Sequence, residues 1–315
     1  MFDFISKRKT FALISCILIA VTLIGALLFK IDIDITFKGG TMLTYSYEGD
    51  IDTNAVKSSV EKALSGQMVN VSSKVDNSIG KTTVVISLAS ATGISSDEQS
   101  AVTSKLEEDF ASNNTVLEQS TVVDPTIGGE FFSKCLVALG FAIILLLVYI
   151  GFRFRKIGGW ATGITGVIAL VHDVIMVFFA LVVFRLPIDA NVMAVILTIL
   201  GYSINDSIVI FDRLRENKKL MPRGTTDEEL INISLNQTFK RCMITSATTI
   251  LTMVVVTIVA LIASVNSILT FSIPMLVGLV SGTYSSICLT SVVWPWLNKK
   301  LSKKNKRKIK KAATV

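Results

Sequence analysis

The stretch LGYSINDSIVIFDRLREN at residues 200–217 constrains the fold of this chain more than any other. Its first half belongs to a run, residues 196–211, that is apolar enough to cross a bilayer and yet contains Asp206. A carboxylate inside a membrane span costs roughly 2.5–3.5 kcal/mol at a helix centre on insertion scales, and less toward the helix ends. A chain that keeps such a group usually uses it for a proton, an ion or a partner helix. The stretch therefore indicates a membrane protein with a functional acid.

The composition of the whole chain agrees with this interpretation. Of 315 residues, 51% are hydrophobic, and the mean hydropathy is +0.61. A helix needs about 17–25 apolar residues to cross about 30 Å of hydrocarbon. Because six runs approach that length, we expect an α-helical polytopic membrane protein with six transmembrane helices, at residues 11–29, 134–150, 160–184, 191–211, 243–263 and 268–297.

Charge predicts the orientation of these helices, because cytoplasmic flanks collect Lys and Arg. Residues 30–130, between the first two spans, carry 15 acidic and 7 basic residues, whereas the other flanks are basic. We therefore expect both termini in the cytoplasm and this acidic segment outside. The predicted divisions are residues 1–30 (N-terminus and first helix), 31–130 (extracytoplasmic domain), 131–297 (helices two to six) and 298–315 (basic cytoplasmic tail).

The extracytoplasmic segment changes from helical to alternating periodicity. Strands are predicted at residues 42–47, 69–75, 81–88 and 116–123, and helices at 53–64 and after Ser95, where Ser95 and Glu98 have capping-box spacing. The order β-α-β-β-α-β is that of a small ferredoxin-like α+β domain. Its acids are scattered and it has no His or Cys, so it is either a contact surface for a polypeptide or partner, or a spacer that docks on a neighbouring subunit.

Other ligand classes receive no support from the sequence. The four cysteines fall in or at the edges of spans, without the spacing of a disulfide framework or a metal site, and we expect no cofactor. The basic tail from Lys299 to Lys311 is more simply explained by membrane lipids and topology than by nucleic acid.

Polar groups recur inside the spans: His172-Asp173 in the third, residues 201–206 in the fourth, Arg241 at the start of the fifth, and GTYSS at 282–286 in the sixth. With VDPTIG at residues 123–128, this arrangement resembles the SecF family, membrane subunits of the bacterial Sec protein-export machinery. The resemblance covers essentially the whole chain. One departure is TFKGG at residues 36–40, where the family usually has DFTGG, so Thr36 and Lys38 replace the usual residues.

The resemblance implies a bacterial cytoplasmic-membrane subunit that is not an enzyme. It implies a heterocomplex with SecD, of the resistance-nodulation-division (RND) superfamily, that uses the proton gradient to help draw exported polypeptide from the SecYEG channel after SecA has pushed it through. It also marks Asp206 and Arg241 as functionally sensitive positions.

Asp206 is the first candidate for the coupling group. A carboxyl group that alternates between an apolar environment and a nearby cation can load and release a proton. Arg241 is expected at a similar depth as the counter-charge, and Asn205 could hold hydrogen bonds to the acid in either state. The alternative is a static ion pair that locks two helices together.

The remaining polar residues allow two interpretations each. The pair His172 and Asp173 is either a proton relay or a satisfied hydrogen bond to a neighbouring helix. An interfacial charge network or hinge is predicted at Asp212, Arg213, Arg215 and Glu216. Close helix packing is predicted at Gly201, Gly278, Gly282, Ser285 and Ser286.

Two rival functions remain open at this stage. An RND-type proton antiporter for small molecules would need a substrate-sized pocket and usually a larger external region than the roughly 100 residues available. A non-transporting scaffold would tolerate substitution of Asp206 and Arg241. An intramembrane hydrolase is disfavoured because no Gly-x-Ser-x-Gly or His-Glu-x-x-His motif is present.

Overall fold

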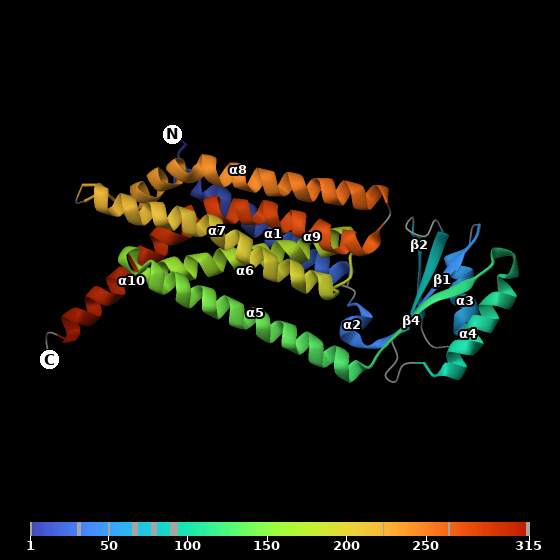
Figure 1. Ribbon diagram of the computed structural model, residues 1–315. Coiled ribbons are helices and arrows are strands. Elements are labelled where there is room, and N and C mark those ends of the chain that lie inside the picture. Colours follow the sequence, from blue (N-terminus) through green and yellow to red (C-terminus); the bar gives the residue numbers. More distant parts are fainter. Residues whose placement is uncertain are drawn as a thin grey trace.

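The computed structural model shows a bundle of long helices with a small α/β domain at one end (Figure 1). It describes residues 2–29, 33–49, 51–64, 69–76, 81–88, 94–222, 224–263 and 265–312. Helix α1 begins, and helix α10 ends, at the end of the bundle opposite the sheet (Figure 1).

Six helices in the described part are long and apolar enough to cross a membrane, which confirms the predicted number of spans. The sixth span consists of three consecutive segments: α9, a π-helical turn η3, and α10. The bounds are α1 (Arg8–Phe29), α5 (Pro125–Arg153), α6 (Gly159–Phe184), α7 (Ala190–Leu220), α8 (Asp227–Ile262), α9 (Asn266–Tyr284), η3 (Ser285–Leu289) and α10 (Thr290–Ala312).

Helices α6, α7 and α9 form the centre of the bundle. About half of the residues in the apolar windows of α6 and α7 are buried, whereas few residues in those of α5 and α8 are buried. The central helices carry the small and hydroxylated residues that allow close approach, and α5 is apolar on all sides. The exposed faces of α5 and α8 therefore suit lipid or another membrane subunit.

The α/β domain has the predicted order of elements, β1 (Gly40–Tyr47), α3 (Thr53–Ala63), β2 (Val69–Asp76), β3 (Lys81–Leu88), α4 (Ser96–Asp109) and β4 (Val116–Val123). Its strands lie in the order β2-β3-β1-β4 and all neighbours are antiparallel. The alternating residues Leu43, Val84 and Ile86 form a core with Val102 of α4. The predicted capping box of Ser95 and Glu98 is present at the start of α4.

The domain joins the bundle through two chain segments that lie against each other. The short helix α2 (Ile35–Lys38) places the Phe37 ring against Phe131 and Phe132 of α5, with ring centroids 5.5 and 5.1 Å apart. A Cβ atom on Gly128 would lie 3.0 Å from the Phe37 carbonyl oxygen, so a larger residue here would push against the backbone of α2. At residues 36–40, where the sequence departs from the usual family motif, the Thr36 backbone N–H donates to Asp34 Oδ1 at 2.9 Å. Asp34 therefore caps α2.

Two predicted boundaries fall inside continuous helices. Helix α5 begins at Pro125, ahead of the expected start at residue 131, because Asp124 caps it. Helix α10 continues through residue 298, where the tail was expected to begin. The basic side chains from Lys304 onward lie outside the described part, so their contact with lipid stays a prediction.

Candidate functional site

Asp206 lies on the side of α7 that faces α8. Its residue surface is only 3% exposed. The Ser246 hydroxyl of α8 donates to Asp206 Oδ2 at 3.1 Å, and the Cys242 thiol, one turn earlier on α8, also bonds to this carboxylate. Burial of a carboxyl group with two neutral partners is costly unless the group is protonated or finds a cation.

Arg241 and Asn205 do not hold Asp206 in this structure. Arg241 is exposed on α8, and no ion pair of the described residues joins it to Asp206, although its charge interacts with the carboxylate. Asn205 is exposed on α7, because consecutive helix residues point about 100° apart. The counter-charge role of Arg241 therefore stays a prediction.

Asp173, on α6, is the most completely enclosed acid of the described spans, with 0% exposure. Three hydroxyls donate to its carboxylate: Ser203 of α7 at 2.6 Å, Ser281 of α9 at 2.6 Å, and Ser285 of η3 at 2.8 Å. This carboxylate therefore fastens α6 to α7 and to the sixth span.

The π-helical turn η3 explains how two consecutive serines both reach the interior. A π-helix adds a residue to the turn, so neighbouring side chains are closer in direction than in an α-helix. Ser285 bonds to Asp173, and Ser286 donates to the Ser203 carbonyl oxygen at 3.1 Å. The Ser207 and Ser286 hydroxyls lie 3.2 Å apart. Helix α7 thus presents its own Asp206 toward α8 on one side and contacts Asp173 of α6 on another.

His172 is also buried, with 4% exposure. Its Nδ1 lies 3.4 Å from Asp173 Oδ1 and 3.3 Å from the Ser281 hydroxyl, while its Nε2 has no hydrogen-bond partner in the structure. Its ring packs against Tyr284, whose hydroxyl donates to the Phe11 carbonyl oxygen of α1 at 2.7 Å. The pair is therefore hydrogen-bonded to several helices but leaves one ring nitrogen unused.

The glycines predicted to pack differ in their surroundings. A Cβ atom on Gly278 would overlap the Ile199 side chain of α7, and one on Gly282 would lie 3.2 Å from Ser203 Cβ and 3.6 Å from Asp173 Oδ2. Among the described residues, no atom of another segment lies within 4 Å of the Cβ position of Gly201, so the close packing expected there stays a prediction.

The charges in the last part of α7 form a network of ion pairs. Asp212 pairs with Arg215 at 2.6 Å and with Arg153 of α5 at 3.3 Å, and Arg213 pairs with Glu216 at 2.5 Å. The Asp212 side chain is half exposed, so these pairs contribute little individually. Their position agrees with an interfacial role.

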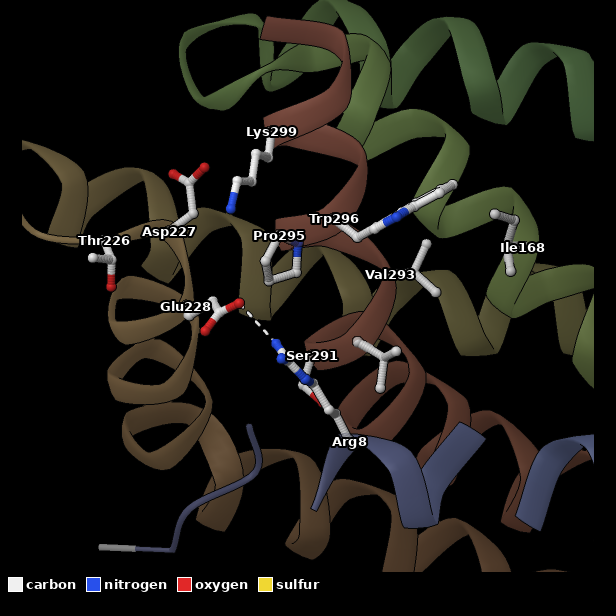
Figure 2. A pocket seen from close by; sticks show the side chains of 11 residues that line it. Arg8, Ile168, Thr226, Asp227, Glu228, Ser291, Val293, Pro295, Trp296 and Lys299 are labelled. Carbon is white, nitrogen blue, oxygen red and sulfur yellow. Dashed lines mark hydrogen bonds and ion pairs between the residues drawn. The ribbon is translucent and has the colours of Figure 1, made fainter. Parts of the chain in front are cut away.

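A cavity of about 910 Å³ lies near the start of α1 and α8 and beside α10. Figure 2 shows the Arg8–Glu228 ion pair, 2.7 Å, on one side and Trp296 and Ile168 on the other. Neither Asp206 nor Asp173 lines this cavity. Across the described ranges, no three His, Cys, Asp or Glu side chains are grouped as metal ligands.

Sequence reasoning missed the groups that hold the two acids: Ser203, Ser246, Ser281 and Cys242. One signal was available, because Cys242 and Ser246 share a face of α8 at a spacing of four residues. Single serines in apolar helices are common, and nothing in the pattern shows which neighbouring helix they face.

Comparison with known proteins agrees with these features. The family model "Protein export membrane protein SecD/SecF, C-terminal" matches residues 102–300. A SecF protein translocase subunit from Calditerrivibrio nitroreducens is 32% identical over 92% of this chain and 91% of its own length. The SecDF translocase subunit of Bacillus subtilis is 33% identical over 96% of this chain. This chain spans only 39% of that longer protein.

A solved structure has the same overall architecture. The crystal structure of SecDF, a translocon-associated membrane protein from Thermus thermophilus, matches 96% of this chain with a TM-score of 0.76 and 29% identity, over 39% of the SecDF chain. Since the family model matches more than half of the chain and SecF subunits match over nearly all of it, the chain belongs to the SecD/SecF family of protein-export membrane proteins, on its SecF side.

Proposed function

We propose that this auxiliary subunit of Sec translocation uses the proton gradient to promote export of polypeptides, with Asp206 as the group that loads and releases the proton. The observation that carries the proposal is the position of Asp206. This carboxyl group is 3% exposed inside a span, and its hydrogen-bond partners among the described residues are a hydroxyl and a thiol. These surroundings favour the protonated state, since a protonated carboxyl group is neutral and donates one hydrogen bond.

Arg241 supplies the second environment that a proton carrier requires. It is adjacent to Cys242, so a rotation or shift of α8 against α7 replaces the neutral partners of Asp206 with a guanidinium. Asp206 then releases its proton and pairs with Arg241. The carboxyl group thus changes its partner together with the position of α8.

The energy available is sufficient for such a movement. Each elementary charge that crosses the membrane delivers about 2.3 kcal/mol per 100 mV. A few protons, or one proton under a typical gradient, therefore bias a two-state equilibrium by several kcal/mol. The α/β domain moves with the bundle through the contact of Phe37 with Phe131 and Phe132, because both chain crossings are packed there.

The SecDF relatives support SecD as the partner. The matched SecDF proteins are longer than this chain, which spans about two fifths of their length, and the remainder is the natural counterpart of a separate SecD subunit. In this proposal, SecD binds the exposed faces of α5 and α8. The assembled complex then interacts with the exported polypeptide, SecYEG and SecA. Both termini lie in the cytoplasm in this proposal, and the α/β domain lies outside the bacterial cytoplasmic membrane. No covalent chemistry is assigned to the chain.

The test is gradient-driven export in vesicles that contain the chain, its SecD partner and the SecYEG channel. Asp206→Asn should reduce export to the rate seen when the gradient is collapsed, while the complex with SecD still assembles. Asp212→Asn is the matched control, since that acid lies on the same helix but is half exposed and paired with Arg215. Loss of the SecD complex in Asp206→Asn would instead favour a structural ion pair, and unchanged export would favour a scaffold.

A further inference from the structure

The His172–Asp173 pair has features of an ion-binding site that the role of Asp206 does not use. Both carboxylate oxygens of Asp173 accept hydrogen bonds from serine hydroxyls, at 2.6, 2.6 and 2.8 Å, which is how an ionised carboxylate satisfies its acceptors. Within the described part of the chain, the ion pair of Asp173 involves His172 and no Lys or Arg. A charge buried this completely needs a positive partner.

The hydrogen positions of the pair follow from its contacts. Ser281 has one hydroxyl hydrogen, and its contact with Asp173 at 2.6 Å is much shorter than its contact with His172 at 3.3 Å. The hydrogen therefore goes to the carboxylate, and His172 Nδ1 carries a hydrogen of its own that points at Asp173 and Ser281. In the neutral ring, Nε2 is then an unprotonated base, buried and without a partner.

Among the residues that the structure describes, no other charged group faces this base. The elements packed around it contribute Ser15 and Cys16 from α1, Ser203 from α7, Ser281 and Tyr284 from α9, and Ser285 from η3. Asp206 faces away, toward α8. A proton added to His172 is therefore stabilised by one adjacent carboxylate, Asp173.

His172 lies beside an almost wholly apolar groove that adjoins the charged cavity of Figure 2. His172 lines a groove of about 350 Å³ between α1, α6 and the start of α10. This groove shares Ile168, Val292 and Val293 with the charged cavity of Figure 2. Ile168 and His172 are four residues apart on α6, which is about 6 Å along the helix. The histidine is thus about one helical turn from the part of the cavity wall that Ile168 forms.

We propose that His172 Nε2 is a second proton-binding site of the membrane domain, with Asp173 as the residue that positions the ring and balances its charge. A hydrated proton from the cavity of Figure 2 forms the Nε2–H bond and leaves water behind, so the pair changes from a net charge of −1 to 0, and release reverses the step. Because Asp173 also fastens α6 to α7 and to the sixth span, the change alters the force between these helices. This inference rests on the proposed proton-driven function.

The chain contains a single histidine, so one label reports this site alone. The experiment is solid-state nitrogen NMR of the full chain, labelled with ¹⁵N-histidine, purified with a tag free of histidine and assembled in bilayers with unlabelled SecD. We expect the Nδ1–H tautomer at alkaline pH and an imidazolium on acidification. In Asp173→Asn, the Nε2–H tautomer should gain population and the imidazolium signal should weaken at the same pH.

Several outcomes would overturn the inference: an Nε2–H tautomer in the native chain at alkaline pH, no imidazolium at any pH that the complex survives, or an Asp173→Asn spectrum identical to the native one. The native spectrum needs no substitution, so a variant that fails to fold leaves the test decisive. If the spectra contradict the inference but Asp206→Asn still loses gradient-driven export, the proposed function stands alone. If the spectra agree and Asp206→Asn exports normally, the proton site exists and the role of Asp206 fails.

Discussion

Ser246 Oγ of α8 donates a 3.1 Å hydrogen bond to Asp206 Oδ2 of α7, deep inside the bundle. Ser246 has no exposed surface, and Asp206 has almost none. A hydroxyl serves either state of a carboxyl group, because it donates to the charged form and accepts from the protonated form. The contact therefore permits protonation of Asp206 without leaving a buried polar atom unpaired.

Removal of this hydroxyl should weaken the α7–α8 contact modestly. Hydrogen bonds between membrane helices average about 0.6 kcal/mol, so Ser246→Ala should lower the free energy of unfolding by about that amount and reduce gradient-driven export about threefold. Thr252→Ala is the matched control, since its hydroxyl bonds only to the Thr248 carbonyl of its own helix. Unfolding in mixed detergent and export in vesicles provide the two readouts. Equal effects of both variants would contradict the assigned role of Ser246.

Arg241 should matter for export more than for the resting structure. It makes no ion pair with Asp206 in the conformation described, so Arg241→Ala should leave assembly and thermal stability within about 0.5 kcal/mol of the parent, as for surface substitutions. Gradient-driven export should nevertheless fall to the rate without a gradient. The neighbouring exposed Lys240→Ala is the control and should export normally. A large loss of stability in Arg241→Ala would indicate a resting ion pair instead.

Gly278 of α9 should tolerate no larger side chain while the Ile199 side chain of α7 packs against it. Its added Cβ would overlap the end of the Ile199 side chain, and overpacking of this kind costs about 1–3 kcal/mol. We expect Gly278→Ala to destabilise the chain and Ile199→Val to restore part of the loss, because the shorter side chain frees the space. Gly140→Ala, where the Cβ meets no atom within 4 Å, should be nearly neutral. A double-mutant cycle in detergent measures the coupling, and strictly additive effects would contradict the contact.

The α/β domain should lose stability in acid through Asp109. The Ser59 hydroxyl of α3 donates to Asp109 of α4 at 2.5 Å, and this bond, with the Lys105 ammonium, holds the pKa of the Asp109 carboxyl below its usual range. A carboxyl group whose folded-state pKa is depressed stabilises the fold above its unfolded-state pKa, and that contribution disappears as the pH falls through the folded-state pKa.

Ser59→Ala should therefore lower the protection of α3 and α4 amides against hydrogen exchange at neutral pH. The difference from the parent should shrink as the pH falls through the folded-state pKa of Asp109, which lies below the usual range of a carboxyl group. Ser58→Ala, whose hydroxyl bonds only within α3, is the control. A difference that persists unchanged in acid would show that the Ser59 effect does not depend on the Asp109 charge.

The sequence predicted the elements better than their contacts. The six spans follow from the length of the apolar runs, and the β-α-β-β-α-β order follows from the change of period and the Ser95 capping box. The rotation of each helix is set by packing between segments distant in sequence. Depth along α7 and α8 could therefore be estimated for Asp206 and Arg241, but not which side chain would face the acid.

The hydrogen bonds from Ser203, Ser281 and Ser285 to Asp173 depend on two features that no local sequence pattern reveals. One is the π-helical turn at Ser285, which directs two adjacent serines inward. The other is the close approach of the sixth span to α7 at Gly282, which brings the hydroxyls of separate helices together. Both are consequences of tertiary packing.

The central claim is that Asp206 changes its protonation state during gradient-driven export. Infrared difference spectroscopy tests this claim most directly. Spectra of the complex in vesicles, recorded during export with and without a proton gradient, should contain a protonated-carboxyl band that rises and falls with the gradient and is absent in Asp206→Asn. A carboxyl signal from Asp206 that stays the same with the gradient on, off or reversed would contradict the account.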